Sequence, residues 1–266
     1  MAKLFTLASW NVEHFQDDPA RVDRVVRFLR DQQPDVFALY EVEGKTVFDS
    51  LTTLMPEWQF HITEGPQTQE ILVGVRKTVT AFFTQRVEFK SGVTLLRPGA
   101  LVSLRFGPRT VTLLFLHTKS SSTPLGLGLR DDMFQRALDF RDTLDKAAGK
   151  PADYLFLGDL NTMGMKYPFD KTINAATELQ KLDQQAARKR MRRLPKTHET
   201  TWWNGTASLP PSNLDHVIAA DHLKFKAFNQ AAVDVRGWVR LPTLPEQRQW
   251  IRQHSDHNLL FLQVER

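Results

Sequence analysis

The sequence predicts an α/β protein that folds as one domain. Short apolar runs of the kind that form buried strands alternate, along 266 residues, with segments whose apolar residues recur at helical spacing. Several of these runs begin or end at Asn, Asp, Glu or His, which would gather polar side chains at sheet edges, where ligands bind in α/β proteins. No linker rich in Gly, Ser or Pro divides the chain, so we expect a single catalytic domain over residues 1–266.

Local signals predict the individual elements. Asp18 and Pro19 supply an N-cap and a first-turn proline, and apolar residues follow them at helical spacing. Residues 130–147 carry a second amphipathic pattern. In chain order we expect a strand ending at Asn11, a helix over 19–32, a strand over 36–41, a helix over 44–55, neighbouring strands over 70–76 and 79–89, strands near 100–106 and 110–117, a helix over 130–147, a strand over 154–157, and strands that follow Asp215 and Asn258.

The segment between His117 and Arg130 is rich in Ser, Thr and Gly, a composition typical of loops. We expect a mobile loop there, beside a histidine, that could close over a substrate as a lid. Its apolar part, residues 125–129, could contact an acyl or aryl group.

The most informative motif is Gly158-Asp159-Leu160-Asn161, which follows the apolar run Tyr154–Leu157. A buried strand would end at this point, so the acid and the amide would project from the sheet edge. Polar residues occupy comparable positions at other apolar runs, namely Asn11, Glu13, Glu41, His117, Asp215, Asp256 and His257. Their recurrence predicts one shared polar site.

In this order, the motifs resemble those of the endonuclease/exonuclease/phosphatase family, which includes pancreatic deoxyribonuclease. The matching residues, which span nearly the whole chain, are Trp10-Asn11-Val12-Glu13, Glu41, His117, Gly158-Asp159-Leu160-Asn161, Asp215 and Ser255-Asp256-His257. The resemblance implies a four-layer α/β/β/α sandwich, in which two mostly antiparallel sheets pack face to face with helices outside. It also implies hydrolysis of phosphodiester bonds at one end of the sandwich.

A divalent metal held by oxygen ligands, Mg²⁺ or Mn²⁺, is part of what the resemblance implies. Carboxylates and amides suit such hard cations, and the sequence shows no zinc-type spacing of Cys and His. Glu41 is the principal candidate ligand because it ends a buried run. Asn11, Glu13 and Asp256 are the further expected ligands, and Asp159 and Asn161 could join them directly or through water. Glu13 is equally compatible with an exposed loop carboxylate.

For proton transfer, the family pattern points to His257 with Asp215 behind it. The sequence leaves open whether His257 activates water or, as a cation, stabilises the transition state while Asp159 acts as the base. Asn161 joins Asp159 in the expected catalytic set. The pattern also implies that Glu70 pairs with His117, which could then protonate the leaving oxygen or bind the phosphate.

The basic segment over residues 188–196 bears on the substrate. On a helix, Arg188 and Arg192 share one face and Arg193 lies on the adjacent one, so together they would form a cationic stripe. Such a stripe could bind the phosphates of DNA or RNA, although charged helix faces are often merely solvated. The leading expectation is therefore an endonuclease or general phosphodiesterase. The alternative is a phosphoesterase for a small-molecule or lipid-linked phosphodiester, which the apolar segment 125–129 would suit.

Composition excludes some chemistries. The chain has no cysteine, so neither a thiol nucleophile nor a disulfide framework is available. Its net charge of +5 is mild, because 35 Lys and Arg oppose 30 Asp and Glu. The N-terminus does not resemble a signal peptide, and no apolar run is long enough to span a membrane. We therefore expect a cytoplasmic protein with no obligate protein partner.

Overall fold

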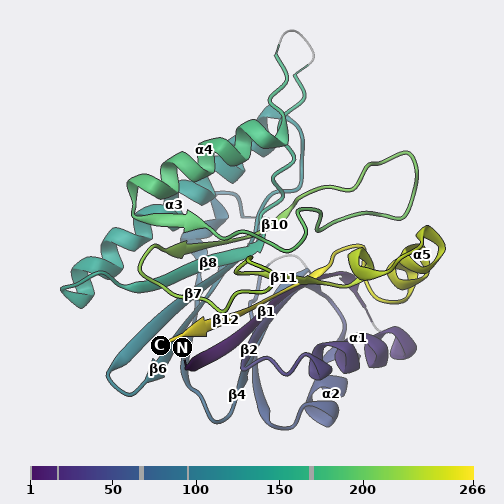
Figure 1. Ribbon diagram of the computed structural model, residues 1–266, viewed down its shortest axis with the longest axis horizontal. Helices are drawn as coiled ribbons and strands as arrows, with labels where there is room; N and C mark the ends of the chain where they lie inside the picture. The colour runs from purple at the N-terminus through teal and green to yellow at the C-terminus, as the bar shows by residue number, and fades with distance from the viewer. Residues whose placement is uncertain (1, 17, 66–68, 95, 168–170) are drawn as a thin grey trace.

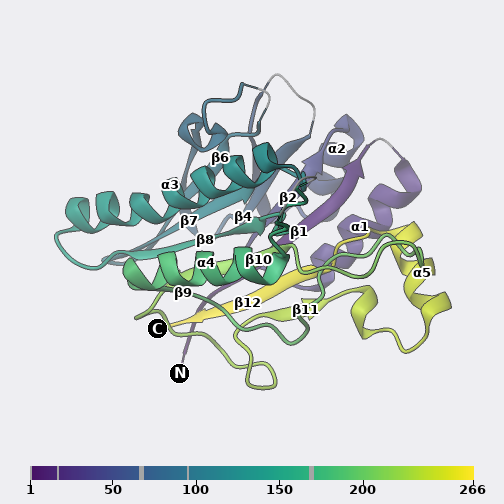
Figure 2. The same cartoon turned by 90° about the horizontal axis from the view of Figure 1, so that it is seen from above.

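A computed structural model describes residues 2–16, 18–65, 69–94, 96–167 and 171–266 of the chain. Two six-stranded sheets pack face to face, with helices on both outer faces (Figures 1 and 2). The expected four-layer sandwich is confirmed. Within each sheet one central pair of strands is parallel and the other pairs are antiparallel.

The first sheet contains both ends of the chain. Its strands, in spatial order, are β11 (Asp234–Arg236), β12 (Leu259–Glu265), β1 (Lys3–Phe15), β2 (Val36–Val42), β4 (Glu70–Arg76) and β3 (Trp58–Ile62). The parallel pair is β1 and β2, so both strands end at the same edge.

The second sheet is built from the middle of the chain. Its strands, in spatial order, are β5 (Thr80–Arg86), β6 (Gly99–Phe106), β7 (Arg109–His117), β8 (Asp153–Asp159), β10 (Asp215–Ala220) and β9 (Met191–Arg193). Here β7 and β8 are the parallel pair, and they also end together.

Five α-helices and two short 3-10 helices are found in the described residues. They are α1 (Pro19–Asp31), α2 (Lys45–Leu54), α3 (Pro124–Ala148), α4 (Ala175–Arg188), α5 (Leu244–Gln253), η1 (Val87–Lys90) and η2 (Trp238–Arg240). Asp18 caps α1 through its side chain, as the sequence predicts. None of the described helices has the length and apolar character needed to cross a membrane.

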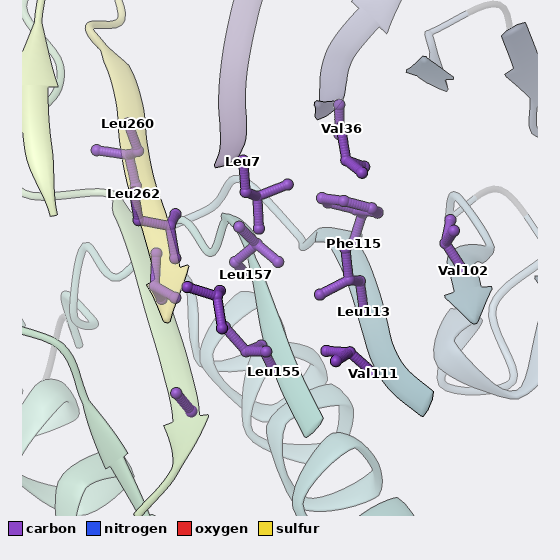
Figure 3. Packing of buried hydrophobic residues seen from close by; sticks show 14 of the residues in the cluster. Leu7, Val36, Val102, Val111, Leu113, Phe115, Leu155, Leu157, Leu260 and Leu262 are labelled. Carbon is purple, nitrogen blue, oxygen red and sulfur yellow. The ribbon is translucent and has the colours of Figure 1, made fainter. Parts of the chain in front are cut away.

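Three apolar layers hold the sandwich together. The central layer lies between the sheets, where Leu7 of β1 faces Leu157 of β8 (Figure 3). One outer layer packs α1 and α2 against the first sheet, and the other packs α3 and α4 against the second. Because strand side chains alternate in direction, inner-face residues join the central layer and their neighbours join an outer one.

Three expectations about elements are wrong, and one strand was missed. The strands near 70–76 and 79–89 are not neighbours, because β4 and β5 lie in different sheets. The expected loop 118–128 is shorter, since α3 begins at Pro124 and includes residues 125–129. The basic segment is not one helix, because α4 ends at Arg188 and β9 follows. Strand β3 was not expected from the sequence.

Candidate active site

The candidate active site lies where the two parallel strand pairs end. Asn11 near the end of β1 and Glu41 at the end of β2 meet His117 and Asp159, which close β7 and β8. A hydrogen bond from Asn11 Nδ2 to Asp159 Oδ2, 2.9 Å long, joins the two sheets at this edge. The expected strand end at Asn11 is wrong, because β1 continues to Phe15, whereas Glu41 and Asp159 lie next to or at the ends of their strands.

Backbone conformation aims the side chains. Glu41 and Asn161 adopt positive φ values of 62° and 49°. Each side chain therefore points in a direction that differs from the regular alternation of side chains along a strand. Gly158 lies inside β8 with φ of 146°, and an added Cβ would lie 2.0 Å from the Leu116 carbonyl oxygen. Only glycine lets β8 approach β7 so closely just before Asp159.

Asn11 connects the two carboxylates on the metal side of the site. Its amide Nδ2 donates to Glu41 Oε1 at 3.1 Å as well as to Asp159. The His14 backbone amide donates to the other Glu41 oxygen at 3.0 Å. Burial opposes ionisation of Glu41, but the nearby His117 ring and these two hydrogen bonds lower its pKa to about 2. Glu41 is therefore an anion at neutral pH.

His257 and Asp215 form the expected pair. His257 Nδ1 lies 2.8 Å from Asp215 Oδ2, while Nε2 faces Asp159 Oδ2 at 3.8 Å and Asp256 Oδ1 at 3.9 Å. Burial alone would lower the pKa of His257, but Asp215 and Asp159 outweigh it and raise the pKa well above the usual value. Asp215 thus fixes the ring orientation and leaves Nε2 facing the other acids.

Asp159 sits between these two groups. Its Oδ1 accepts a hydrogen bond from the backbone N–H of Asn161 at 3.1 Å, and its Oδ2 lies opposite His257. Burial raises the pKa of Asp159 to about 7; His257 opposes the rise and Asp215 adds to it. A carboxyl group with this pKa can take up and release a proton near neutral pH.

Asp256 and Glu13 complete the acidic cluster. Trp202 Nε1 donates to Asp256 Oδ2 at 2.6 Å, and the Asp256 amide donates to Glu13 Oε2 at 3.3 Å. Among the described residues, the buried Asp256 Oδ1 has no hydrogen-bond partner. Burial raises the pKa of both acids, and the mutual repulsion of Glu13 and Asp256 contributes to the rise for Glu13.

His117 lies in the site, but the expected His117–Glu70 pair is wrong. His117 Nε2 lies 3.5 Å from Asp159 and 3.6 Å from Glu41, and its Nδ1 has no hydrogen-bond partner among the described residues. Glu70 instead accepts a hydrogen bond from the Thr63 hydroxyl. The reason is strand alternation: Glu70 shares the outer face of the first sheet with Leu72, whereas His117 follows Phe115 on the inner face.

The pKa of His117 follows from its surroundings. Burial and the charge of Arg97 lower the pKa to about 3, although Glu41 opposes the shift. His117 is therefore neutral at pH 7.

The acids open into a cleft of about 370 Å³. Glu41, Asp256 and His257 form its polar side, together with Asn161. Met163, Trp202 and Leu214 give it an apolar side. No lysine or arginine is found among the described residues that line it.

The basic residues over 188–193 lie elsewhere. Pairing of β9 with β10 places Arg192 opposite Ala219 and Arg193 opposite Ile218, three or four residues along β10 from Asp215. Arg193 Nη2 pairs with Asp183 at 2.8 Å, and Arg192 Nη2 donates to the Leu223 carbonyl at 2.9 Å. The expected continuous stripe is absent from this described part of the chain, so we no longer assign substrate binding to Arg188, Arg192 and Arg193.

The donor set fits a divalent metal. Glu41, His117 and Asp159 offer ligand atoms within 4.8 Å of one another, and Asp159, Asp215 and His257 form a second such group. Asn11 Nδ2 brings the carboxylates of Glu41 and Asp159 together, and among the described residues the buried Asp256 Oδ1 has no hydrogen-bond partner and no lysine or arginine lines the cleft, so negative charge gathers here. A hard cation would neutralise these carboxylates.

Comparison with known proteins agrees with this geometry. The model of the Endonuclease/Exonuclease/phosphatase family matches residues 8–257. The chain belongs to this family. It is therefore a phosphoesterase of a family that depends on divalent metals. A search of curated proteins finds no match.

Solved structures show the same fold. Truncated TDP2 of Caenorhabditis elegans is 16% identical with a TM-score of 0.68, and the alignment covers 98% of each chain. The 3′ phosphatase NExo from Neisseria, bound to a product DNA hairpin, is 12% identical with a TM-score of 0.64 over 98% of this chain and 100% of that one. A mannosyl-6-phosphatase of Bacteroides thetaiotaomicron is 12% identical with a TM-score of 0.60 over 98% and 100%.

Some residues of the site carried no sequence signal. His14, which received no role from the sequence, lines the cleft and lies 3.2 Å from Glu43. Lys196 is buried beneath the site, where Nζ donates to the Asp215 carbonyl at 2.8 Å. Nothing in the local pattern marks His14, and the sequence marked Lys196 only as part of the basic segment 188–196, because its burial depends on a contact with Asp215 that the local sequence does not show.

Proposed function

We propose that this protein is a divalent-metal-dependent phosphodiesterase, with Mg²⁺ or Mn²⁺ as the metal and nucleic acid as the first candidate substrate. The observation that carries the proposal is the constellation at the cleft: His257 is held by Asp215 and faces Asp159, which Asn11 joins to Glu41. Each of these groups has a role in attack on a phosphate ester.

The metal would be held by Glu41 together with oxygen atoms from Asp159 and Asn11, and Asp256 and Glu13 would complete the negative environment. When bound, it supplies positive charge that offsets the phosphate oxygens and lowers the pKa of bound water. The protein's own contribution is to hold these oxygen ligands at the strand ends before substrate arrives.

Proton transfer falls to the pair formed by Asp159 and His257. With Nδ1 turned toward Asp215, His257 presents Nε2 to the cleft. We place the proton taken from water on this pair, whose facing atoms are 3.8 Å apart. The raised pKa of His257 favours its cationic form, which is positioned to donate a hydrogen bond to a phosphoryl oxygen, so the proton from water goes to Asp159. The backbone N–H of Asn161 donates a hydrogen bond to Asp159 and keeps that carboxylate oriented.

The cleft walls favour a substrate with a flat group beside the phosphate. Trp202 is fixed by its hydrogen bond to Asp256 and lines the cleft near Met163 and Leu214. A nucleobase could stack on such a ring, which is how proteins commonly bind single-stranded nucleic acid. We therefore favour a single-stranded or frayed nucleic acid over an intact duplex.

A second candidate is a small-molecule or lipid-linked phosphodiester. The supporting observation is that neither lysine nor arginine lines the described part of the cleft, whereas nucleic-acid sites usually combine stacking with cations. Residues 125–129 no longer support this candidate, since they form the first turns of α3.

One activity panel tests the proposal. Supercoiled and single-stranded DNA, RNA, bis(p-nitrophenyl) phosphate and a phospholipid are offered with Mg²⁺, with Mn²⁺ and with chelator. Glu41→Gln should reduce turnover by at least about a hundredfold. Asp153→Asn, at the opposite end of β8 from Asp159, is the matched control and should retain activity.

Each outcome of the panel is decisive. Chelator-resistant hydrolysis, or full activity of Glu41→Gln, would overturn the metal assignment. Hydrolysis of the aryl or phospholipid substrate without cleavage of DNA or RNA would replace the nucleic-acid assignment with the second candidate.

A further inference from the structure

Arg130 is a fully buried arginine that lies outside the catalytic cluster. Its side chain has 0% exposure and pairs with Glu178 of α4, with Nε 2.6 Å from Oε1 and Nη2 3.0 Å from Oε2. The remaining donors reach backbone carbonyls: Nη1 binds those of Ser121 at 2.6 Å and Lys119 at 3.2 Å, and Nη2 binds that of Gly164 at 2.8 Å. The planar guanidinium thereby connects three separate segments.

Two of these segments leave the catalytic strands directly. Residues 118–123 follow His117, and Ser120 among them lines the cleft. Residues 161–167 follow Asp159 and carry Met163, which also lines the cleft. The segments also bind each other, since the Lys166 amide donates to the Ser122 carbonyl at 2.7 Å. Arg130 therefore connects two parts of the cleft wall.

The packing leaves these segments little room to move. A Cβ on Gly126 would lie 2.4 Å from the Ser121 carbonyl oxygen, and one on Gly164 would lie 2.2 Å from that of Ile173. Glu178 is fixed by a further donor, because the Oε2 that binds Arg130 also accepts from the Gly164 amide at 2.7 Å. These contacts favour a fixed wall in the segment after His117, where composition predicted a mobile lid.

We propose that Arg130 is a positioning residue that holds Ser120 and Met163 in a preformed cleft, and that it thereby sets substrate affinity and selectivity. The inference rests on the proposed phosphodiesterase activity for its kinetic readout. Arg130 does not touch the catalytic acids, so its loss should change how substrate is held more than how the bond is broken.

The test compares two buried arginines of one helix. Arg130→Lys keeps the charge but cannot reach all four partners. Arg141→Lys is the matched control: Arg141 is 1% exposed and binds Asp145 at 2.8 Å, three turns further along α3. Steady-state kinetics on bis(p-nitrophenyl) phosphate with Mn²⁺ gives kcat and KM, and limited trypsin digestion reports cleavage after Lys119 and Lys166.

We expect Arg130→Lys to raise KM by about tenfold with kcat changed by less than about threefold, the pattern of lost binding rather than lost chemistry. Trypsin should cut after Lys119 and Lys166 sooner than in the wild type. Arg141→Lys should leave KM and both cleavage sites unchanged even if the two variants lose similar thermal stability.

Several results would overturn the proposal. They are equal behaviour of the two variants, a fall in kcat at constant KM, or wild-type cleavage after Lys119 as fast as in the denatured chain. If Arg130→Lys does not fold, Glu178→Gln, which removes one charge at constant shape, should show the same KM and trypsin pattern. If wild type hydrolyses no phosphodiester, the proposed function fails, and the trypsin comparison still decides whether Arg130 fixes the two segments.

Discussion

His257 is held by one carboxylate and faces two others, and this arrangement governs both its titration and its use. The Asp215 contact restrains one ring nitrogen, so the other can exchange protons with Asp159. Groups that act through one another lose their function together when either is removed.

His257→Ala and Asp215→Ala should therefore each lower kcat/KM severely, and the double variant should be little worse than the more damaged single one. The measurement is a double-mutant cycle on bis(p-nitrophenyl) phosphate. Multiplicative losses would show that the two side chains act independently.

The same pair of residues makes the unfolding free energy of the metal-free protein depend on pH. Because the folded pKa of His257 is raised, its pairing with Asp215 stabilises the fold fully below the unfolded value of about 6.5. That stabilisation disappears as pH rises through the folded pKa. Urea denaturation in chelator should show a wild-type advantage over Asp215→Asn that is largest near pH 6 and declines in alkaline buffer. An advantage independent of pH would contradict the assignment.

Lys196 should act in the opposite direction. Burial lowers its pKa to about 7, so between that value and about 10.4 the unfolded chain binds more protons than the folded one. Stability should rise across this range by up to about 1.4 kcal/mol per pH unit. In urea denaturation, Lys196→Met should remove this increase of the unfolding free energy with pH, whatever the substitution does to stability at a single pH. If the increase is unchanged in the variant, Lys196 is not its source.

At the scale of elements, the approach of β8 to β7 determines where Asp159 lies. The strands run parallel and end together, and a Cβ on Gly158 would lie 2.0 Å from the Leu116 carbonyl oxygen of β7. A side chain there would push apart the strands that carry His117 and Asp159, so this one position combines a packing requirement with a catalytic one.

Gly158→Ala should cost about 2–4 kcal/mol of unfolding free energy and reduce activity strongly, because its Cβ has no space. Gly107→Ala is the control that distinguishes a steric clash from backbone strain. Gly107 also has a positive φ, 61°, but nothing lies within 4 Å of its added Cβ. It should cost only about 1 kcal/mol and leave activity intact. Equal losses in denaturation and in turnover would refute the packing argument.

The elements also show what the sequence could reveal. The strand ends at Glu41 and Asp159 were predictable, because an apolar run that stops at a polar residue marks a sheet edge directly; Asn11 was not a strand end, since β1 continues to Phe15. The pairing of Glu70 was not, since which face of a strand points inward depends on sheet order. The apolar residues 125–129 suggested a loop, because two glycines obscured a helix that Pro124 starts and Thr123 caps.

At the scale of the whole molecule, the two sheets repeat one pattern. Each has a central parallel pair flanked by antiparallel strands, and the two pairs meet at one edge. Arg188 at the end of α4 and Arg192 and Arg193 of β9 lie away from that edge, whereas Arg97 lies close enough to lower the pKa of His117. The net charge of +5 therefore does not concentrate at the described part of the cleft.

A variant with Arg188, Arg192 and Arg193 changed to Gln should consequently bind single-stranded DNA with the same salt dependence as the wild type. Electrophoretic mobility shifts over a range of salt concentrations provide the measurement, and a small aryl phosphodiester is the control substrate. A salt slope that falls by about 0.7 per lost phosphate contact would restore these residues to the substrate site.

Contacts between distant ends of the sequence have a consequence for when activity can arise. The Ser255 hydroxyl donates to the Asn11 carbonyl, and the Trp10 indole donates to the carbonyl of His257, so the last strand fixes the first. A ribosome-bound chain that lacks residues 255–265 cannot assemble this edge, and neither can a chain that proteases have shortened to the same point. Activity would thus require residues 255–257 to be present and folded against β1, and chains that lack them would be catalytically silent wherever they accumulate.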